Sequence, residues 1–283
     1  MPELPEVETM RRGIAAVVGS RIVEVERPRI SRRPILISPN GAALRKRLVG
    51  RKIIETDRLG KRVVVRLDSG DSIIFEPRMT GLVLITDPPT REHLRLRLFL
   101  ENTKPPRNLE LLFWDRRGLG LVRVVSPAEM IERYGPETLG TDALTITPDE
   151  LSERLAPSRR AIKVALLDQR AVAGIGNLYA SEILHLSAIH PAIGCNRLRD
   201  DDWRRIHKAM RDVLTKAIRY EGSTLSDGTY RNALNKEGGY QNHHRVYDRA
   251  GEPCPGCKTE IVRVVQAQRS TFFCPECQPK KRR

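Results

Sequence analysis

The sequence predicts an α+β protein in which an antiparallel β-domain is followed by a helical region and a small β-hairpin. Three observations predict this order. Short runs of Val, Ile and Leu fill residues 21–125, helical periodicity dominates from 147 to 220, and two Cys-x-x-Cys pairs enclose two apolar runs near the C-terminus. A chain of 283 residues is long enough for two ordinary domains and a small third module.

A helix is expected at the very start of the chain. Its apolar residues recur every three or four positions and are Val7, Met10, Ile14 and Val17. Gly19 is a suitable end for this helix.

The β-domain is predicted from apolar runs separated by Asp, Gly, Pro and Asn turns. The runs are Val63–Val65, Ile73–Phe75, Leu82–Ile85, Leu94–Leu100 and Leu109–Phe113. We expect an antiparallel sandwich or barrel, with Asn102–Asn108 as a loop between the last two strands.

The helical region is predicted to begin after a boundary between residues 135 and 147. Thr147 and Glu150 match a capping box with Pro148 at the first helical position. Acidic residues 200–202 precede a helix expected over 203–218. Residues 221–241 are rich in Gly, Ser, Asn and Asp, and we expect them to form a mobile functional loop.

The composition indicates a polyanionic partner. Fifty Lys and Arg face 35 Asp and Glu, giving a net charge of +15 that is scattered along the chain. A basic soluble protein or a ribosome-associated one is the alternative. No run approaches the roughly 18 apolar residues of a membrane span, and the acidic opening is unlike a signal peptide, so we expect a cytoplasmic protein.

Four cysteines predict a metal centre. Cys254, Cys257, Cys274 and Cys277 form two pairs with sixteen residues between them. This spacing is typical of a closed tetrahedral zinc site, structural because no coordination position stays open. The metal would hold together a hairpin of strands 261–265 and 269–273. Arg269, near its turn, could bind a phosphate or be an ordinary solvated arginine, and Cys195 is given no function.

A glycine turn predicts an anion site. Gly174 and Gly176 precede an apolar helix expected over 178–186, and backbone N–H groups at such a helix start bind phosphate. Asn177 could cap this helix or reach the same phosphate. A tight interhelical turn without a ligand is the alternative.

The N-terminus predicts a nucleophile. Removal of Met1 would leave Pro2 with a free secondary amine, and an α-amino group titrates near 8. The positive end of the helix would favour its neutral form. Such an amine can attack a sugar C1′ and form an iminium, with Glu3 moving the protons. Alternatively, Pro and Glu simply begin a helix well.

Three segments resemble one family closely. They are Pro2–Thr9 (PELPEVET), Gly174–Glu182 (GIGNLYASE) and Gln268–Cys277 (QRSTFFCPEC). Their order and separation identify the chain as similar to the bacterial formamidopyrimidine-DNA glycosylases, which are also 8-oxoguanine DNA glycosylase/AP lyases.

The resemblance implies a fold, a partner and an activity. The fold would comprise an N-terminal β-sandwich at 1–140, a helix-two-turn-helix domain at 141–240 and a zinc hairpin at 241–283. The partner would be double-stranded DNA with oxidised or abasic sites, bound by a monomer at the nucleoid. The activity would be excision of oxidised purines followed by β,δ-elimination.

The resemblance also implies site residues. Pro2 would be the nucleophile, Glu3 its acid/base partner, Lys61 a phosphate or proton contact, and Glu6 a supporting group. The residues expected to contact DNA are Met79, His93, Arg117, Leu119, Lys163, Asn177 and Arg269. Met79 would be a wedge in the duplex and Arg117 would contact the orphaned cytosine.

The sequence departs from the family pattern in one loop. Leu119 stands where an aromatic wedge is expected, and Gly118 where a second basic residue is common. We expect altered lesion search or opposite-base preference. Segment 221–241 corresponds to the lesion-capping segment.

Two other functions compete with this interpretation. An endonuclease VIII type enzyme would favour oxidised pyrimidines, but it has glycine where this chain has Leu4. A non-catalytic damage-binding protein would have no need of Pro2, Glu3, Glu6 and Lys61 together.

Overall fold

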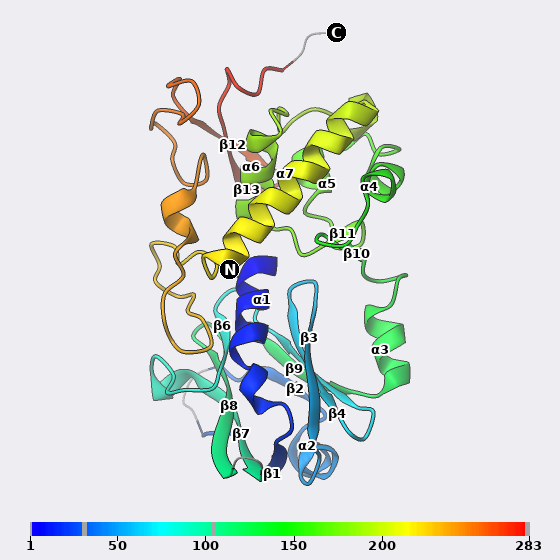
Figure 1. The fold of residues 1–283 in the computed structure, drawn as a ribbon, viewed down its shortest axis with the longest axis vertical. Coiled ribbons are helices and arrows are strands. Elements are labelled where there is room, and N and C mark those ends of the chain that lie inside the picture. The colour runs from blue at the N-terminus through cyan, green and yellow to red at the C-terminus, as the bar shows by residue number, and fades with distance from the viewer. Residues whose placement is uncertain (1, 30–32, 104–105, 281–283) are drawn as a thin grey trace. The chain divides into compact units, whose positions relative to one another are not determined.

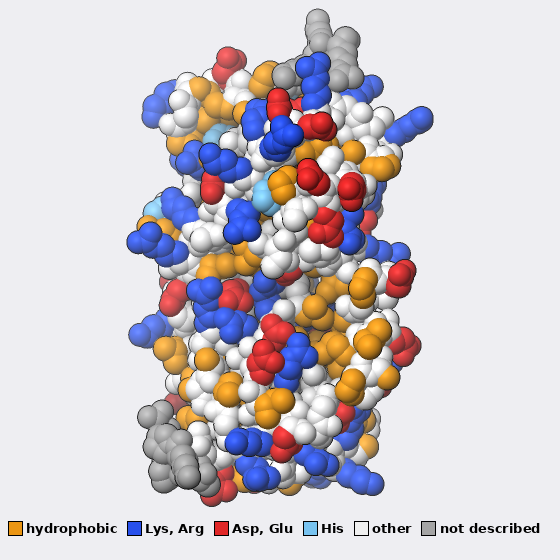
Figure 2. Space-filling view, turned by 45° about the vertical axis from the view of Figure 1, so that its right-hand side comes forward, with side chains coloured by type: hydrophobic (Ala, Val, Ile, Leu, Met, Phe, Trp, Pro, Cys, Tyr) orange, Lys and Arg blue, Asp and Glu red, His pale blue; other side chains and the backbone are white. Residues whose placement is uncertain are grey.

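A computed structural model describes residues 2–29, 33–103 and 106–280. The chain forms two compact units, one of residues 1–135 with 218–241 and the other of 136–217 with 242–283. Lys and Arg side chains are spread over the face in Figure 2 instead of gathering in one patch. In the described part of the chain, no helix combines the length and apolarity needed to span a membrane.

The first unit is a β-sandwich preceded by a helix, as predicted (Figure 1). Helix α1 (Leu4–Gly13) ends in a short 3₁₀ turn, η1 (Ala15–Val17). One sheet has the order β1-β7-β8-β6 and the other the order β2-β9-β5-β4-β3. The strands of the first sheet are β1 (Arg21–Glu26), β7 (Leu94–Thr103), β8 (Pro106–Asp115) and β6 (Gly81–Leu84). Those of the second are β2 (Leu36–Ser38), β9 (Leu121–Val125), β5 (Ser72–Glu76), β4 (Arg62–Leu67) and β3 (Ile53–Leu59).

The two sheets and α1 share one hydrophobic core. Met10 of α1, Phe75 of the second sheet and Phe113 of the first are all buried in the same cluster. Among the described residues of these two sheets, all strand pairs are antiparallel except β2 with β9. Every residue of β5 and β6 is buried, which explains why continuous apolar runs of the sequence located these two strands.

Four elements of this unit differ from the predictions. The loop expected over 102–108 is narrower, because β7 and β8 pair as far as Thr103 and Pro106. Helix α2 (Gly41–Leu48) lies within residues 21–125, where only strands were expected, and helix α3 (Pro127–Tyr134), for which no prediction was made, follows this region. A short 3₁₀ turn, η2 (Arg91–His93), precedes β7.

The second unit is mainly helical and ends in a hairpin. Its longer helices are α4 (Pro148–Leu155), α6 (Asn177–Leu186) and α7 (Asp200–Arg219), the last of which continues two residues into the first unit. Shorter elements are β10 (Thr141–Asp142), α5 (Ile162–Ala165), β11 (Val172–Ala173), η3 (Cys195–Arg197) and η4 (Tyr240–His243). The hairpin is β12 (Val262–Gln266) and β13 (Arg269–Phe273), within one residue of the prediction.

Local capping explains where α4 begins. The hydroxyl of Thr147 accepts a hydrogen bond from the backbone N–H of Glu150 at 3.1 Å, and Pro148 occupies the first turn. The Glu150 carboxylate accepts hydrogen bonds from the Arg154 guanidinium at 2.9 Å and from the hydroxyl of Thr141, outside the helix.

Candidate active site and metal centre

The start of α1 holds Pro2 and Glu3 in a buried setting. Glu3 is the N-cap residue, and its backbone N–H donates to Glu6 Oε2 at 2.9 Å. Both carboxylates are 3% exposed. Pro5 lies in the first turn, where its missing N–H leaves no hydrogen bond unmade. Glu6 therefore fixes the backbone next to Pro2, at the positive end of the helix.

Glu6 also connects the helix to segment 221–241. Its Oε1 accepts the N–H of Ser223 at 2.8 Å. Gly222 has a φ of +78°, and a Cβ on it would lie 2.8 Å from the same oxygen, so this turn requires glycine. Tyr230 and Ala233 are buried in the sandwich core. The segment expected to be a mobile loop is thus packed at its middle.

Lys61 lies on the two-residue turn between β3 and β4. Leu59 pairs with Arg62 across the turn, and of the two turn residues Gly60 has a positive φ of +58°. This is the pattern of a type II′ hairpin turn, which glycine adopts without strain. Helix α1 contacts both β3 and β4, so the turn and the helix start belong to one packed assembly.

Met79 and the loop 115–120 are joined by a buried carboxylate. Asp115 is fully buried, and Thr80 donates its hydroxyl to Oδ1. The N–H groups of Arg117 and Gly120 donate to the same carboxylate at 3.2 and 2.7 Å. The residue after Met79 is therefore bonded to the loop that carries Arg117 and Leu119. Met79 and Arg117 are exposed, and Leu119 is half-buried.

The structure gives a physical reason for Gly118. Its φ is +64°, and a Cβ at this position would lie 2.8 Å from the backbone oxygen of Arg33. A basic side chain does not fit in this loop conformation. The conformation of this loop therefore requires glycine at position 118, where the family commonly has a basic residue.

His93 is buried, although DNA contact was expected of it. Its Nε2 lies 3.0 Å from Glu92 Oε1, and its ring meets Trp114 edge-on with centroids 5.5 Å apart. Its expected contact with DNA remains a prediction.

Three of the residues expected to contact DNA lie in the second unit. Lys163 is fully buried and its Nζ donates to Asn177 Oδ1 at 2.6 Å. Asn177 Nδ2 donates to the carbonyl of Ser270 at 2.9 Å, beside the exposed Arg269. Gly176 is the N-cap of α6, so capping by Asn177, one of the two expected roles, is wrong.

The hairpin turn places Arg269 at the start of β13. Gln266 pairs with Arg269, and both residues between them have positive φ, 47° for Ala267 and 62° for Gln268. Two positive φ values define a type I′ turn, which matches the twist of the strands. Arg269 is thereby exposed directly beside the turn of the hairpin.

The four cysteines of the hairpin form a site that fits zinc. Their sulfur atoms all lie within 4.8 Å of one another. Cys254 and Cys277 are 3.8 Å apart and Cys257 and Cys274 3.4 Å apart, close to the roughly 3.8 Å between ligands of a tetrahedral zinc–thiolate centre. His185 Nε2, 3.4 Å from Cys254 Sγ, can donate to that thiolate. Four sulfur ligands leave no position for a substrate, so the ion is structural.

Removing zinc is expected to open the hairpin selectively, because few apolar residues are buried under it. Hydrogen exchange after chelation should show loss of protection in β12 and β13. Amides of the β3–β4 hairpin in the first unit serve as the control and should stay protected. Unchanged protection of β12 and β13 in metal-free protein would contradict a structural role for the metal.

Comparisons with known proteins decide the family. The model of the formamidopyrimidine-DNA glycosylase N-terminal domain matches residues 1–122, and that of the H2TH domain of the same enzymes matches 135–229. A zinc finger found in FPG and IleRS matches residues 251–280. The chain belongs to the formamidopyrimidine-DNA glycosylase family. It is therefore a DNA glycosylase of base excision repair with a structural zinc ion.

Relatives of this glycosylase cover nearly all of the chain. The formamidopyrimidine-DNA glycosylase of Chloroflexus aggregans is 40% identical over 98% of both chains. The crystal structure of the MutM (FPG) protein of Thermus thermophilus has a TM-score of 0.84 at 36% identity, covering 99% of this chain and 100% of that one. The Lactococcus lactis Fpg in complex with DNA containing an abasic site has a TM-score of 0.85 at 31% identity, covering 98% and 100%.

The structure adds contacts that the sequence analysis did not predict. Asp115 begins the loop of Arg117 and Leu119, and Glu182 ends the segment Gly174–Glu182, but the sequence alone indicates no role for either carboxylate. Glu182 is fully buried and accepts three backbone N–H groups, those of Arg245, Val246 and Tyr247, at 2.8–2.9 Å. An acidic residue within the apolar helix of residues 178–186 was the available signal, because a buried carboxylate requires partners.

Proposed function

We propose that the protein excises oxidised purines, 8-oxoguanine and formamidopyrimidines, and then cleaves the strand through a Schiff base on Pro2. After removal of Met1, the amine attacks C1′ and the C1′–N9 bond breaks, with the base leaving as it gains a proton. The sugar ring opens to an iminium, the C2′ proton is lost, and the 3′ and then the 5′ phosphate leave. Water finally releases the enzyme.

The burial and anchoring of the α1 start is the observation that carries this proposal. Glu3, the acid/base group, is buried where the helix begins and next to the nucleophile. Glu6 supports both by bonding the Glu3 N–H and the Ser223 N–H. Lys61, which lies on the neighbouring β3–β4 turn, would contact the phosphate or transfer a proton.

We further propose how DNA is held. Lys163, Asn177 and Arg269 would bind phosphate, supported by the hydrogen bonds between Lys163, Asn177 and the backbone of Ser270. Met79, Arg117 and Leu119 would fill the gap left by the extruded nucleotide, and His93 would contact the backbone. The enzyme would act as a monomer at the nucleoid, with the sandwich, helix-two-turn-helix and zinc modules bounded at 1–140, 141–240 and 241–283.

A lesion panel with borohydride tests the proposal. The duplexes contain 8-oxoguanine, a formamidopyrimidine, an oxidised pyrimidine or an abasic site, each opposite all four bases. We expect covalent trapping and strand cleavage with the oxidised purines and the abasic site. Trapping on oxidised pyrimidines alone would support the endonuclease VIII alternative. Binding to the lesions with neither trapping nor cleavage would support the non-catalytic one.

A further inference from the structure

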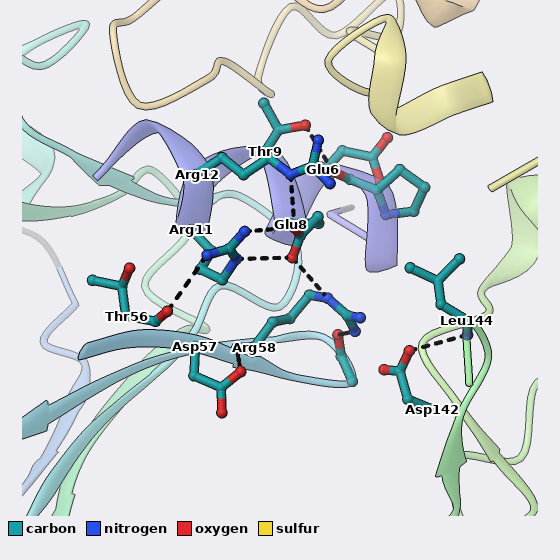
Figure 3. Close-up of polar contacts among 12 residues, drawn as sticks. Glu6, Glu8, Thr9, Arg11, Arg12, Thr56, Asp57, Arg58, Asp142 and Leu144 are labelled. Carbon is teal, nitrogen blue, oxygen red and sulfur yellow. Dashed lines mark hydrogen bonds and ion pairs between the residues drawn. The ribbon is translucent and has the colours of Figure 1, made fainter. Parts of the chain in front are cut away.

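The carboxylate of Glu8, on α1, is surrounded by three guanidinium groups (Figure 3). Arg11 donates to it through Nε at 3.0 Å and Nη2 at 2.8 Å, and Arg12 through Nε at 2.7 Å. Arg58 donates through Nε at 3.2 Å, and the side chains of Glu8 and Arg58 are each only 10% exposed. This cluster has no place in the mechanism proposed above.

Arg58 differs from the other two arginines in its origin. Arg11 and Arg12 follow Glu8 by three and four residues on the same helix, the spacing at which helical side chains meet. Arg58 comes from β3, and its Nη1 donates to the carbonyl of Gly60 at 3.0 Å. One side chain therefore connects the helix to the turn that carries Lys61.

Glu6 and Glu8 hold α1 from two sides. Two residues correspond to about 200° around a helix, so their side chains leave it in nearly opposite directions. Glu6 is bonded to the backbone of Ser223, and Glu8 to Arg58 of the β3–β4 hairpin. The helix headed by Pro2 and Glu3 is thus fixed on both sides within its first two turns.

The electrostatics keep this contact intact at neutral pH. Burial raises the pKa of the Glu8 carboxyl, but the hydrogen bonds from Arg11 and Arg12 and the charges of Arg11 and Arg58 outweigh it, so the pKa lies below its ordinary value. The ion pairs of Glu8 therefore stabilise the folded state at any pH above the ordinary pKa of a glutamate. This stabilisation is lost as the pH falls through the lowered pKa of Glu8. At pH 7 Glu8 is charged and accepts all three arginines.

We propose that Arg58 and Glu8 are positioning residues that set the distance between Lys61 and the Pro2–Glu3 pair. Neither touches the substrate in this account. Arg58 holds the Lys61 turn through the Gly60 carbonyl and is itself held by Glu8. The inference rests on the proposed function of Pro2, Glu3 and Lys61.

Single-turnover kinetics with Arg58→Gln and Glu8→Gln test the proposal. We expect both variants to lower the rate of Schiff-base formation on 8-oxoguanine by about 10- to 100-fold, since small displacements of reacting groups cost this much. Binding to a non-cleavable abasic-site analogue should change by less than about threefold, because the phosphate contacts remain. The double variant should be no slower than the slower single variant, because the two residues act as one unit.

Two control variants separate positioning from general stability. Arg66→Gln removes ion pairs to Asp57 at 2.7 Å and to Glu55 at 3.2 Å on the same hairpin, and leaves the hydrogen bonds of Arg58 to Glu8 and Gly60 in place. Arg12→Gln removes a Glu8 contact from a side chain that is 60% exposed and leaves the hairpin link in place. Both should keep the wild-type rate. Arg58→Lys, which retains the charge and can bond only one acceptor well, should recover part of the rate.

Three outcomes would overturn the proposal. The first is a rate of Schiff-base formation in both Arg58→Gln and Glu8→Gln that lies within about twofold of the wild-type rate, or about 0.4 kcal/mol. The second is an equal loss of rate in Arg66→Gln. The third is a loss in the double variant that equals the product of the two single losses. If Arg58→Gln does not fold, Glu8→Asp, which shortens the reach to Arg58, provides the same comparison. Failure of wild-type protein to form any trapped complex would instead reject the proposed function itself.

Discussion

Replacing Glu3 with Gln is expected to stop release of 8-oxoguanine while leaving cleavage at a pre-formed abasic site largely intact. Glu3 is only 3% exposed, and Gln fits the same buried space because its side chain has nearly the same shape. It cannot supply or accept the proton that the leaving base requires, and loss of general acid–base catalysis costs about 10²- to 10⁴-fold. Single-turnover assays of base release and of abasic-site cleavage measure the two steps separately.

The control for this experiment is Glu24→Gln, an exposed carboxylate on β1 of the same unit. It should excise the base at the wild-type rate. Equal base release by Glu3→Gln and wild type would contradict the acid/base role of Glu3. An equal loss at both steps would show that Glu3 acts on the sugar chemistry as a whole.

Replacing Glu182 with Ala is expected to cause the largest loss of stability in the second unit. The substitution leaves the three N–H groups of residues 245–247 without their acceptor, and each unsatisfied donor costs about 1–3 kcal/mol. The segment beyond Val246, which shares a cluster with Ile261 and Phe272, should therefore open more readily by about 3 kcal/mol or more. Native-state hydrogen exchange of the β12 and β13 amides measures this free energy.

Glu252→Ala is the matched control for Glu182. It removes an ion pair with Arg249 in which Glu252 is 53% exposed, and should cost about 0.5 kcal/mol or less. A Glu182→Ala protein that opens within about 1 kcal/mol of wild type would show that the buried carboxylate does not hold this segment.

The elements with strong local signals were predictable from the sequence. Helix α6 and the β12–β13 hairpin follow from a glycine turn and from cysteine spacing, each a short-range pattern. Helix α3 was missed although Ser126 and Glu129 form a capping box around Pro127. Its eight residues follow β9 after Ser126, at the end of the region whose apolar runs predict strands.

The side-chain contacts of the site were not predictable in the same way. Arg58 and Glu8 are separated by 50 residues, and Thr80 and Asp115 by 35. Nothing in the local pattern of either partner specifies the other, because sheet pairing and helix packing bring them together. The place of Lys163 in the site came from the family resemblance, but its complete burial against Asn177 came from the structure.

The protein atom to which trapped DNA is attached shows directly whether the Pro2 amine is the nucleophile. The wild-type enzyme is reduced with borohydride on an 8-oxoguanine duplex, digested, and mapped by tandem mass spectrometry. We predict an N-terminal peptide that begins at Pro2, lacks Met1 and carries the deoxyribose remnant on the Pro2 nitrogen. An adduct on Lys61 or another lysine, or an active enzyme that retains Met1, would rule out attack by the Pro2 amine.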